Sequence, residues 1–229
     1  MTNTLTASKQ TAQTISLKKY GAIAAIAFPV LQMVSQGFMQ VGGVEPSFAA
    51  PGGEILSFFQ SRDVTLFTIG EYISILSLVA FLWFLGGLWD ELRTAEGGNG
   101  WLSLIAVGSG LVTVSLILGA GGWYLAIFRI GDGLDPEIAR LLFDQGNLNF
   151  AQIWVALGSM VLVVGIIASL SDHFPTWLSW ASIILAIGLF LARAVWTQSI
   201  AFAPYVLFWV WMIALGVIML RRNRGNTVS

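Results

Sequence analysis

The chain has 229 residues, of which 56% are hydrophobic and only 10% are charged, and its formal net charge is −1. Ordinary soluble domains carry about 25% charged residues, so this chain has too few to cover a water-facing surface. With no basic face and no recognition motif, it is not expected to bind nucleic acid. The chain has no cysteine, which excludes disulfides, cysteine-ligated clusters and thiol nucleophiles, and we expect neither a metal site nor a cofactor.

The hydrophobic residues come in continuous runs of about 20, the length that a helix needs to span about 30 Å of hydrocarbon. The runs do not alternate with polar residues, which favours helices over a membrane barrel. We therefore predict an all-α integral membrane protein, with a polar tail at 1–19 that is mobile, a membrane domain at 20–220 and a basic tail at 221–229. The six predicted spans are residues 20–41, 64–89, 101–128, 149–170, 176–196 and 201–220.

Two connections between spans are predicted to carry short amphipathic helices that lie at the membrane interface. These are EILSFFQSR at 54–62 and EIARLLFDQ at 137–145, the second after the N-cap residue Asp135. The surrounding segments, 52–67 and 135–150, align without gaps, which indicates a parallel internal repeat. Chance matching of two apolar sequences is the alternative interpretation.

The distribution of basic residues predicts that both chain ends face the cytoplasm. Six spans put the two termini on one side of the membrane, and that side collects seven of the eleven cations. An excess of lysine and arginine marks the cytoplasmic face. The terminal-side cations are Lys9, Lys18, Lys19, Arg93, Arg221, Arg222 and Arg224, and those on the other side are Arg62, Arg129, Arg140 and Arg193. His173 falls in the turn at 171–175, where a solvated loop histidine is expected.

The second predicted span carries Glu71 about two turns from its first end. A carboxylate in hydrocarbon costs several kcal/mol unless it is paired, protonated or facing water, so Glu71 marks a candidate functional site. At 1.5 Å per residue, Glu71 lies roughly 10 Å below the outer boundary, and polar residues of other spans fall in the same half of the membrane. The candidate ligand-binding residues are Glu71, Gln32, Gln36, Arg193, Tyr124 and Gln152.

Two interpretations of this polar layer stay open from the sequence. The layer could form a pocket open to the outer face, with Glu71 as its anchor and Arg193 as the countercharge. The same side chains could instead only bond helix to helix, with Arg193 reaching to the interface. No HExxH, GxSxG, Walker or paired-aspartate motif is present, which favours a role other than catalysis.

A longer stretch, PSFAAPGGEILSFFQSRDVTLFTIGEYISILSLVAFLWFLGGLWDELR at 46–93, resembles a family of small bacterial multi-pass membrane proteins known as a domain of unknown function. The shared pattern is a short outer amphipathic helix, a span that ends in a tryptophan- and leucine-rich run, and a charged cytoplasmic turn. The resemblance covers the first four spans loosely. It implies a six-span protein of the bacterial inner membrane and carries over no catalytic residues.

Three functions are compatible with these features. The first is binding, sensing or transport of a small or lipidic ligand through an outer-leaflet polar pocket around Glu71. The second is a structural accessory subunit of a larger membrane complex, with the glycine-rich span at 101–128 as its docking face. The third is an enzyme that modifies a lipid, which would need a second ionisable group close to Glu71. The expected partners are the lipid bilayer, a lipid or small hydrophobic ligand, and other membrane subunits.

Overall fold

The computed structural model describes the backbone of residues 2–43 and 45–225 and the side chains of residues 18–43 and 45–222. Within this part of the chain the architecture is helical, and six helical segments are long and apolar enough to cross a membrane. This confirms the predicted all-α multi-pass membrane fold. The six segments are Lys18–Met39, Val64–Glu96, Trp101–Asp132, Pro136–Leu170, Thr176–Ala194 and Ser199–Arg222.

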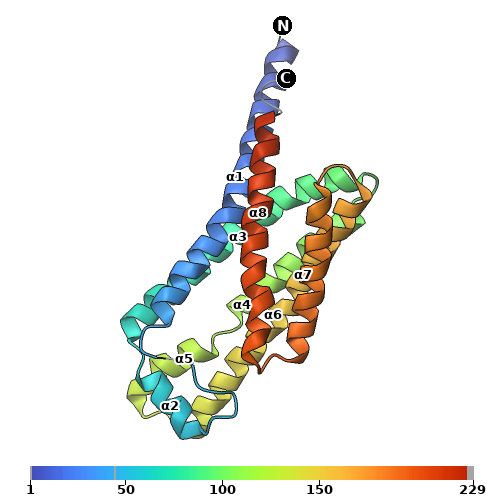
Figure 1. Ribbon diagram of the computed structural model, residues 1–229. Helices are drawn as coiled ribbons and strands as arrows, with labels where there is room; N and C mark the ends of the chain where they lie inside the picture. Colours follow the sequence, from blue (N-terminus) through green and yellow to red (C-terminus); the bar gives the residue numbers. More distant parts are fainter. Residues whose placement is uncertain (1, 44, 226–229) are drawn as a thin grey trace.

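The helices form two packed groups that share one core. Helix α1 (Thr2–Met39) packs along α3 (Val64–Glu96) and α8 (Ala203–Gly225). Helices α4 (Trp101–Leu118) and α7 (Thr176–Ala194) pack against α6 (Pro136–Leu170). The first turns of α1 and the last turns of α8 lie at the same end of the molecule, which we call the terminal end (Figure 1).

The opposite end, which we call the cap end, carries a second small core of its own. The cap consists of α2 (Gly52–Gln60), α5 (Gly122–Arg129), η1 (Ile130–Asp132) and the first turns of α6 (Figure 1). The apolar side of α2 is buried in this core, because Ile55 and Phe59 are 0% exposed. The buried members are Ala50, Ile55, Phe58, Phe59, Phe67, Ala126, Ile127, Ala139 and Phe143.

The two predicted amphipathic helices are therefore used differently from each other. The segment at 54–62 forms α2, but its apolar side packs on protein rather than on lipid. The segment at 137–145 is the first part of α6, which runs without a break for 35 residues. At 1.5 Å per residue such a helix is about 52 Å long, well beyond the roughly 30 Å of hydrocarbon. Its first turns can thus pack in the cap while the rest crosses the membrane.

The third predicted span is interrupted near the cap end. Helix α4 ends at Leu118, residues 119–121 make a turn, and α5 begins at Gly122. A methyl group at Gly122 would lie 2.5 Å from the carbonyl oxygen of Leu142, so α5 approaches α6 closely at this position. Ser115 and Gly119, two small residues four positions apart in this span, are exposed.

The helices also extend further at the terminal end than the hydropathy pattern predicts. Helix α1 begins at Thr2, so residues 2–19, predicted as a mobile polar tail, are helical. Helix α3 continues to Glu96 and shortens the polar connection to residues 97–100. Helix α8 continues to Gly225, and the remainder of the predicted basic tail, 226–229, lies outside the described residues.

The outward faces of the crossing helices are apolar. Large side chains on them stay exposed in the isolated chain, for example Trp83 at 52%, Leu104 at 62% and Ile184 at 66%. A soluble monomer rarely exposes so continuous an apolar surface. These faces are therefore the surface that contacts the lipid bilayer.

Candidate functional site

A cavity lies between the cap and the cap ends of the two helix groups, and we call it the cap cavity. It has two adjoining compartments, of about 340 Å³ and about 170 Å³. Both compartments are lined by Glu45, Asn147, Phe150 and Phe202. These four residues come from the segment after α1, from α6 and from η2 (Ser199–Phe202), so the cavity depends on the tertiary arrangement of distant elements.

The smaller compartment is lined by Glu71, and we call it the Glu71 compartment. Glu71 lies in the second turn of α3 and is half-buried, and its side chain lines this compartment. No hydrogen bond or ion pair to Glu71 is found among the side chains that the structure describes. The other lining residues are Gln36, Met39, Gln40, Glu45, Phe67, Ala120, Trp123, Tyr124, Gly146, Asn147, Phe150 and Phe202.

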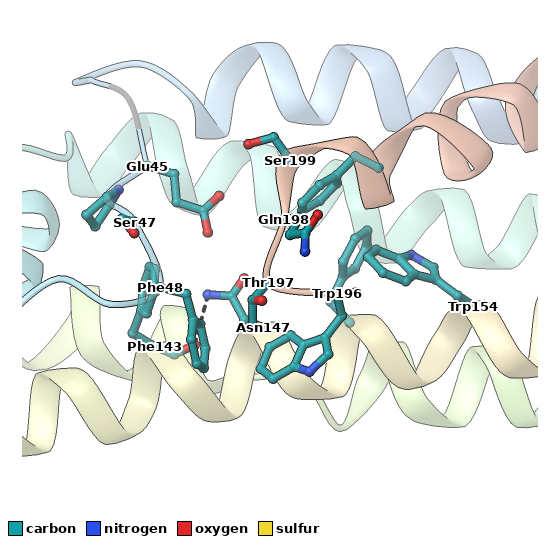
Figure 2. A pocket seen from close by; sticks show the side chains of 13 residues that line it. Glu45, Ser47, Phe48, Phe143, Asn147, Trp154, Trp196, Thr197, Gln198 and Ser199 are labelled. Carbon is teal, nitrogen blue, oxygen red and sulfur yellow. Dashed lines mark hydrogen bonds between the residues drawn. The ribbon is translucent and has the colours of Figure 1, made fainter. Parts of the chain in front are cut away.

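The larger compartment is lined by Trp196, and we call it the Trp196 compartment. Figure 2 shows the Glu45 side chain entering it from the loop after α1, with Gln198 and Asn147 on other walls. The Trp154 ring extends from α6 toward the same space (Figure 2). The other lining residues are Pro46, Ser47, Phe48, Phe143, Phe150, Trp196, Thr197, Ser199 and Phe202.

The position of Glu71 is set by polar contacts between α1 and α3. The Ser35 hydroxyl donates to the carbonyl oxygen of Gly70 at 2.8 Å, one residue before Glu71. The Gln32 amide donates to the Ser77 hydroxyl at 2.7 Å, about two turns further along α3. These buried bonds hold the two helices in register, since a buried polar group left without a partner is costly.

Arg62 positions the loop that carries Glu45. It lies between α2 and α3, two residues after the end of α2. The Arg62 guanidinium donates to the carbonyl oxygens of Met39 and Gly43 at 3.0 Å each, and its Cζ lies 4.2 Å from the Phe58 ring centroid. These bonds tie the loop that carries Glu45 to the junction between α2 and α3. Burial also lowers the pKa of Arg62, and the nearby Glu45 carboxylate acts in the opposite direction.

The Glu45 carboxyl group has an unusual electrostatic environment. Burial raises the pKa of Glu45 above its ordinary value of 4.5, while the Asn147 side chain and the Arg62 guanidinium oppose this rise. Burial therefore favours the neutral, protonated form of this carboxyl group more than water does. A positive charge bound beside Glu45 in the cap cavity would act in the opposite direction and favour its ionised form.

The structure brings three of the six predicted ligand-binding residues to one place. Glu71, Gln36 and Tyr124 all line the Glu71 compartment. They come from α3, α1 and α5, as the predicted convergence of separate spans requires.

The other three predicted residues lie elsewhere. Gln32 bonds helix to helix, as described above. Arg193 donates to the Gln152 side-chain oxygen at 3.4 Å and lies 5.9 Å from the Trp196 ring centroid, and it lines neither compartment. Its proposed pairing with Glu71 is therefore not seen among the described residues.

Sequence reasoning missed Glu45 and Asn147, which line the same compartment as Glu71. One signal was available, because Glu45 is the only charged residue between Val41 and Gly53. A lone acid in an otherwise uncharged loop is a candidate for a specific contact. That Glu45 and Glu71 line one compartment depends on the tertiary arrangement of the loop and α3, and could not be read from spacing.

A second buried polar cluster lies at the terminal end. Glu91 on α3 is 5% exposed, and its Oε2 lies 2.9 Å from His173 Nε2 and 3.9 Å from Arg222 Nε. Arg222 also donates to the His173 carbonyl oxygen, and its Nη2 lies 2.8 Å from His173 Nδ1. Because arginine only donates, Nδ1 accepts, and Nε2 carries the proton that is donated to Glu91.

This cluster corrects two expectations. His173 is not a solvated loop residue, because its side chain is only 16% exposed and is bonded on both ring nitrogens. Glu91, expected in a polar connection, lies in the buried part of a continuous helix. The cluster joins α3, the turn between α6 and α7, and the end of α8, so its evident role is to hold these elements together.

Comparison of the chain with protein-family models, with characterised proteins and with solved structures found no match. The resemblance of residues 46–93 to a bacterial membrane-protein family stays a prediction. Function is therefore inferred from the cap cavity itself.

Proposed function

We propose that this chain is a bacterial inner-membrane protein that binds a small ligand in the cap cavity, with Glu71 as the anchoring carboxylate. The observation that supports this most is the position of Glu71. It lies in a crossing helix, lines a cavity, and has no protein partner among the described side chains. A carboxylate that only joined helices would be bonded across the interface, as Gln32 is.

The composition of the cavity also supports ligand binding. Ligand sites combine apolar walls with a few convergent polar groups, and drug-sized ligands occupy about 300–1,000 Å³. The cap cavity has aromatic walls, two carboxylates and several amides, and its compartments lie at or below the lower end of that range. The ligand is therefore a small molecule with at least one polar group.

Native mass spectrometry from mild detergent tests this proposal. We expect the wild type to carry a small ligand that Glu71→Gln loses, because this change removes the charge and keeps the shape. Glu54→Gln is the matched control, since Glu54 is exposed on α2 and lines neither compartment. Equal ligand occupancy in all three proteins would refute the role of Glu71. Co-purification of a second protein in place of a small molecule would support the accessory-subunit alternative instead.

The proposed orientation places both termini in the cytoplasm and the cap on the outer side. It is supported by the excess of lysine and arginine at the terminal end. Because the chain has no cysteine, single substitutions report each side without interference. A membrane-impermeant maleimide added to whole cells should label Glu54→Cys in the cap and not Asn99→Cys in the connection at 97–100. The reverse labelling pattern would overturn the assignment.

A further inference from the structure

The charge of the cap cavity is strongly biased toward negative. Glu45 and Glu71 both line it, and none of the described lining residues is lysine or arginine. Arg62 is the cation that acts on Glu45, but it is engaged by backbone carbonyl oxygens and lines neither compartment. Removing a carboxylate from water disfavours its charged form, and a cation bound beside it favours that form again. A cation is therefore the ligand charge that the described lining of the cavity complements.

The walls of the cavity are suited to an organic cation rather than a hydrated ion. Phe150 and Phe202 form a stacked pair with ring centroids 5.7 Å apart, and Trp154 packs edge-on against both at 5.7 and 5.6 Å. All three line the Trp196 compartment, and two of them also line the Glu71 compartment. The faces of aromatic rings attract cations, and clusters of such rings recognise quaternary ammonium groups.

Two indole N–H groups in the cavity walls are closed off from the cavity space. Trp154 is 1% exposed, and its indole Nε1 has no hydrogen-bond partner among the described residues. The indole N–H of Trp123, in the wall of the Glu71 compartment, is also buried without a partner. Both nitrogens have almost no accessible surface, so a ligand in the cavity does not reach them, and the aromatic rings themselves define its preference.

We infer that the ligand of the cap cavity is a small organic cation, a protonated amine or a quaternary ammonium compound. This inference rests on the proposed function and deepens it. The positive group lies among the aromatic rings between Glu45 and Glu71. An anion would be repelled by both carboxylates, and a neutral apolar molecule would remove them from water without replacing the lost interactions.

The test compares choline with its uncharged analogue 3,3-dimethylbutan-1-ol, which has the same shape and hydroxyl group. Binding to the full-length protein in mild detergent is measured by calorimetry. We expect choline to bind the wild type and Glu54→Gln at least about tenfold more tightly than the neutral analogue. Glu45→Gln and Glu71→Gln should each weaken choline binding by about tenfold or more and leave the neutral analogue unaffected. Thermal unfolding of each ligand-free variant checks that the fold is retained.

The outcomes separate this inference from the proposed function. If choline binds no more tightly than the neutral analogue, or does not bind, the cation inference is overturned. If the wild type nevertheless carries a ligand that Glu71→Gln loses, the proposed function stands with a ligand of another class. If that Glu71-dependent ligand is also missing, both fail.

Discussion

Helices α1 and α3 touch through their backbones at Gly21 and Gly87, and this contact supports the most specific stability prediction. A methyl group added at Gly87 would lie 2.9 Å from Gly21 Cα, and one added at Gly21 would lie 2.7 Å from Gly87 Cα. Carbon atoms prefer separations of about 3.5–4.0 Å, so the two helices would have to move apart by roughly 0.6–1.1 Å. The obstacle is backbone, which cannot rotate away as a flexible side chain can.

The expected magnitude follows from two opposing terms. Overpacking of a well-packed interior costs about 1–3 kcal/mol, while replacing glycine by alanine in a helix contributes about 1 kcal/mol of stabilisation. Gly87→Ala should therefore be neutral to destabilising by about 2 kcal/mol. Gly86→Ala is the matched control, because Gly86 is the neighbouring residue and has nothing within 4 Å of an added methyl group. Gly86→Ala should therefore show only the stabilisation of about 1 kcal/mol that alanine contributes in a helix.

The measurement is reversible unfolding by sodium dodecyl sulfate in mixed micelles, followed by tryptophan fluorescence. The difference between the two alanine variants isolates the packing cost, which we expect to be about 1–3 kcal/mol. Gly87→Val should widen this difference, because its larger side chain meets the same backbone. If Gly87→Ala proves as stable as Gly86→Ala, the close approach of α1 and α3 at this point is refuted.

Three further predictions follow from the described contacts. Glu91→Ala should destabilise the protein by about 3–5 kcal/mol, because it leaves His173 and Arg222 without their buried partner. The control is Asp90→Ala, which removes the more exposed ion pair between Asp90 and Lys18. It should cost about 0–1 kcal/mol in the same unfolding assay. Burial raises the pKa of Glu45, so its protonated form is the one that favours the folded state. The contribution of Glu45 to the free energy of unfolding is therefore fully present below the ordinary pKa of 4.5 and is lost as pH rises through the raised pKa of the folded protein. The wild type should thus lose stability relative to Glu45→Gln over that window, and parallel pH profiles would contradict this. Gly122→Ala should destabilise the cap by about 1–3 kcal/mol. Gly121→Ala should not, because an added methyl group there meets nothing within 4 Å. Hydrogen exchange of the cap amides distinguishes the two variants.

Some parts of the candidate site could be predicted, and the reason is geometric. Depth along a crossing helix follows directly from residue number at 1.5 Å per residue. Glu71, Gln36 and Tyr124 were predicted on this basis to lie at one level of the bundle, and they line one compartment. Residue number does not show which neighbouring helix a side chain faces. Depth alone therefore could not separate these residues from others at the same level.

Gln32 and Gln36 show this limit within one helix. They lie four residues apart on the same face of α1, yet Gln32 meets Ser77 of α3 and Gln36 lines the cavity. The two helices stay in contact at both levels, since Ser35 also bonds to the Gly70 carbonyl oxygen. The difference arises because Gln36 borders the space that α3 shares with α5, α6 and η2. Only the positions of both helices determine which glutamine bonds a neighbour and which is available to a ligand.

The sequence by itself determined the class of the protein, its six crossing segments and the isolated carboxylate at Glu71. These follow from local hydropathy, because each residue's cost in hydrocarbon depends little on distant parts of the chain. The tertiary structure alone decided that the amphipathic segments close a cap, that Glu45 joins Glu71, and that His173 and Glu91, 82 residues apart, share a buried bond. Those contacts depend on long-range packing, and that packing turns a single acid in an apolar helix into a cavity with two carboxylates and aromatic walls.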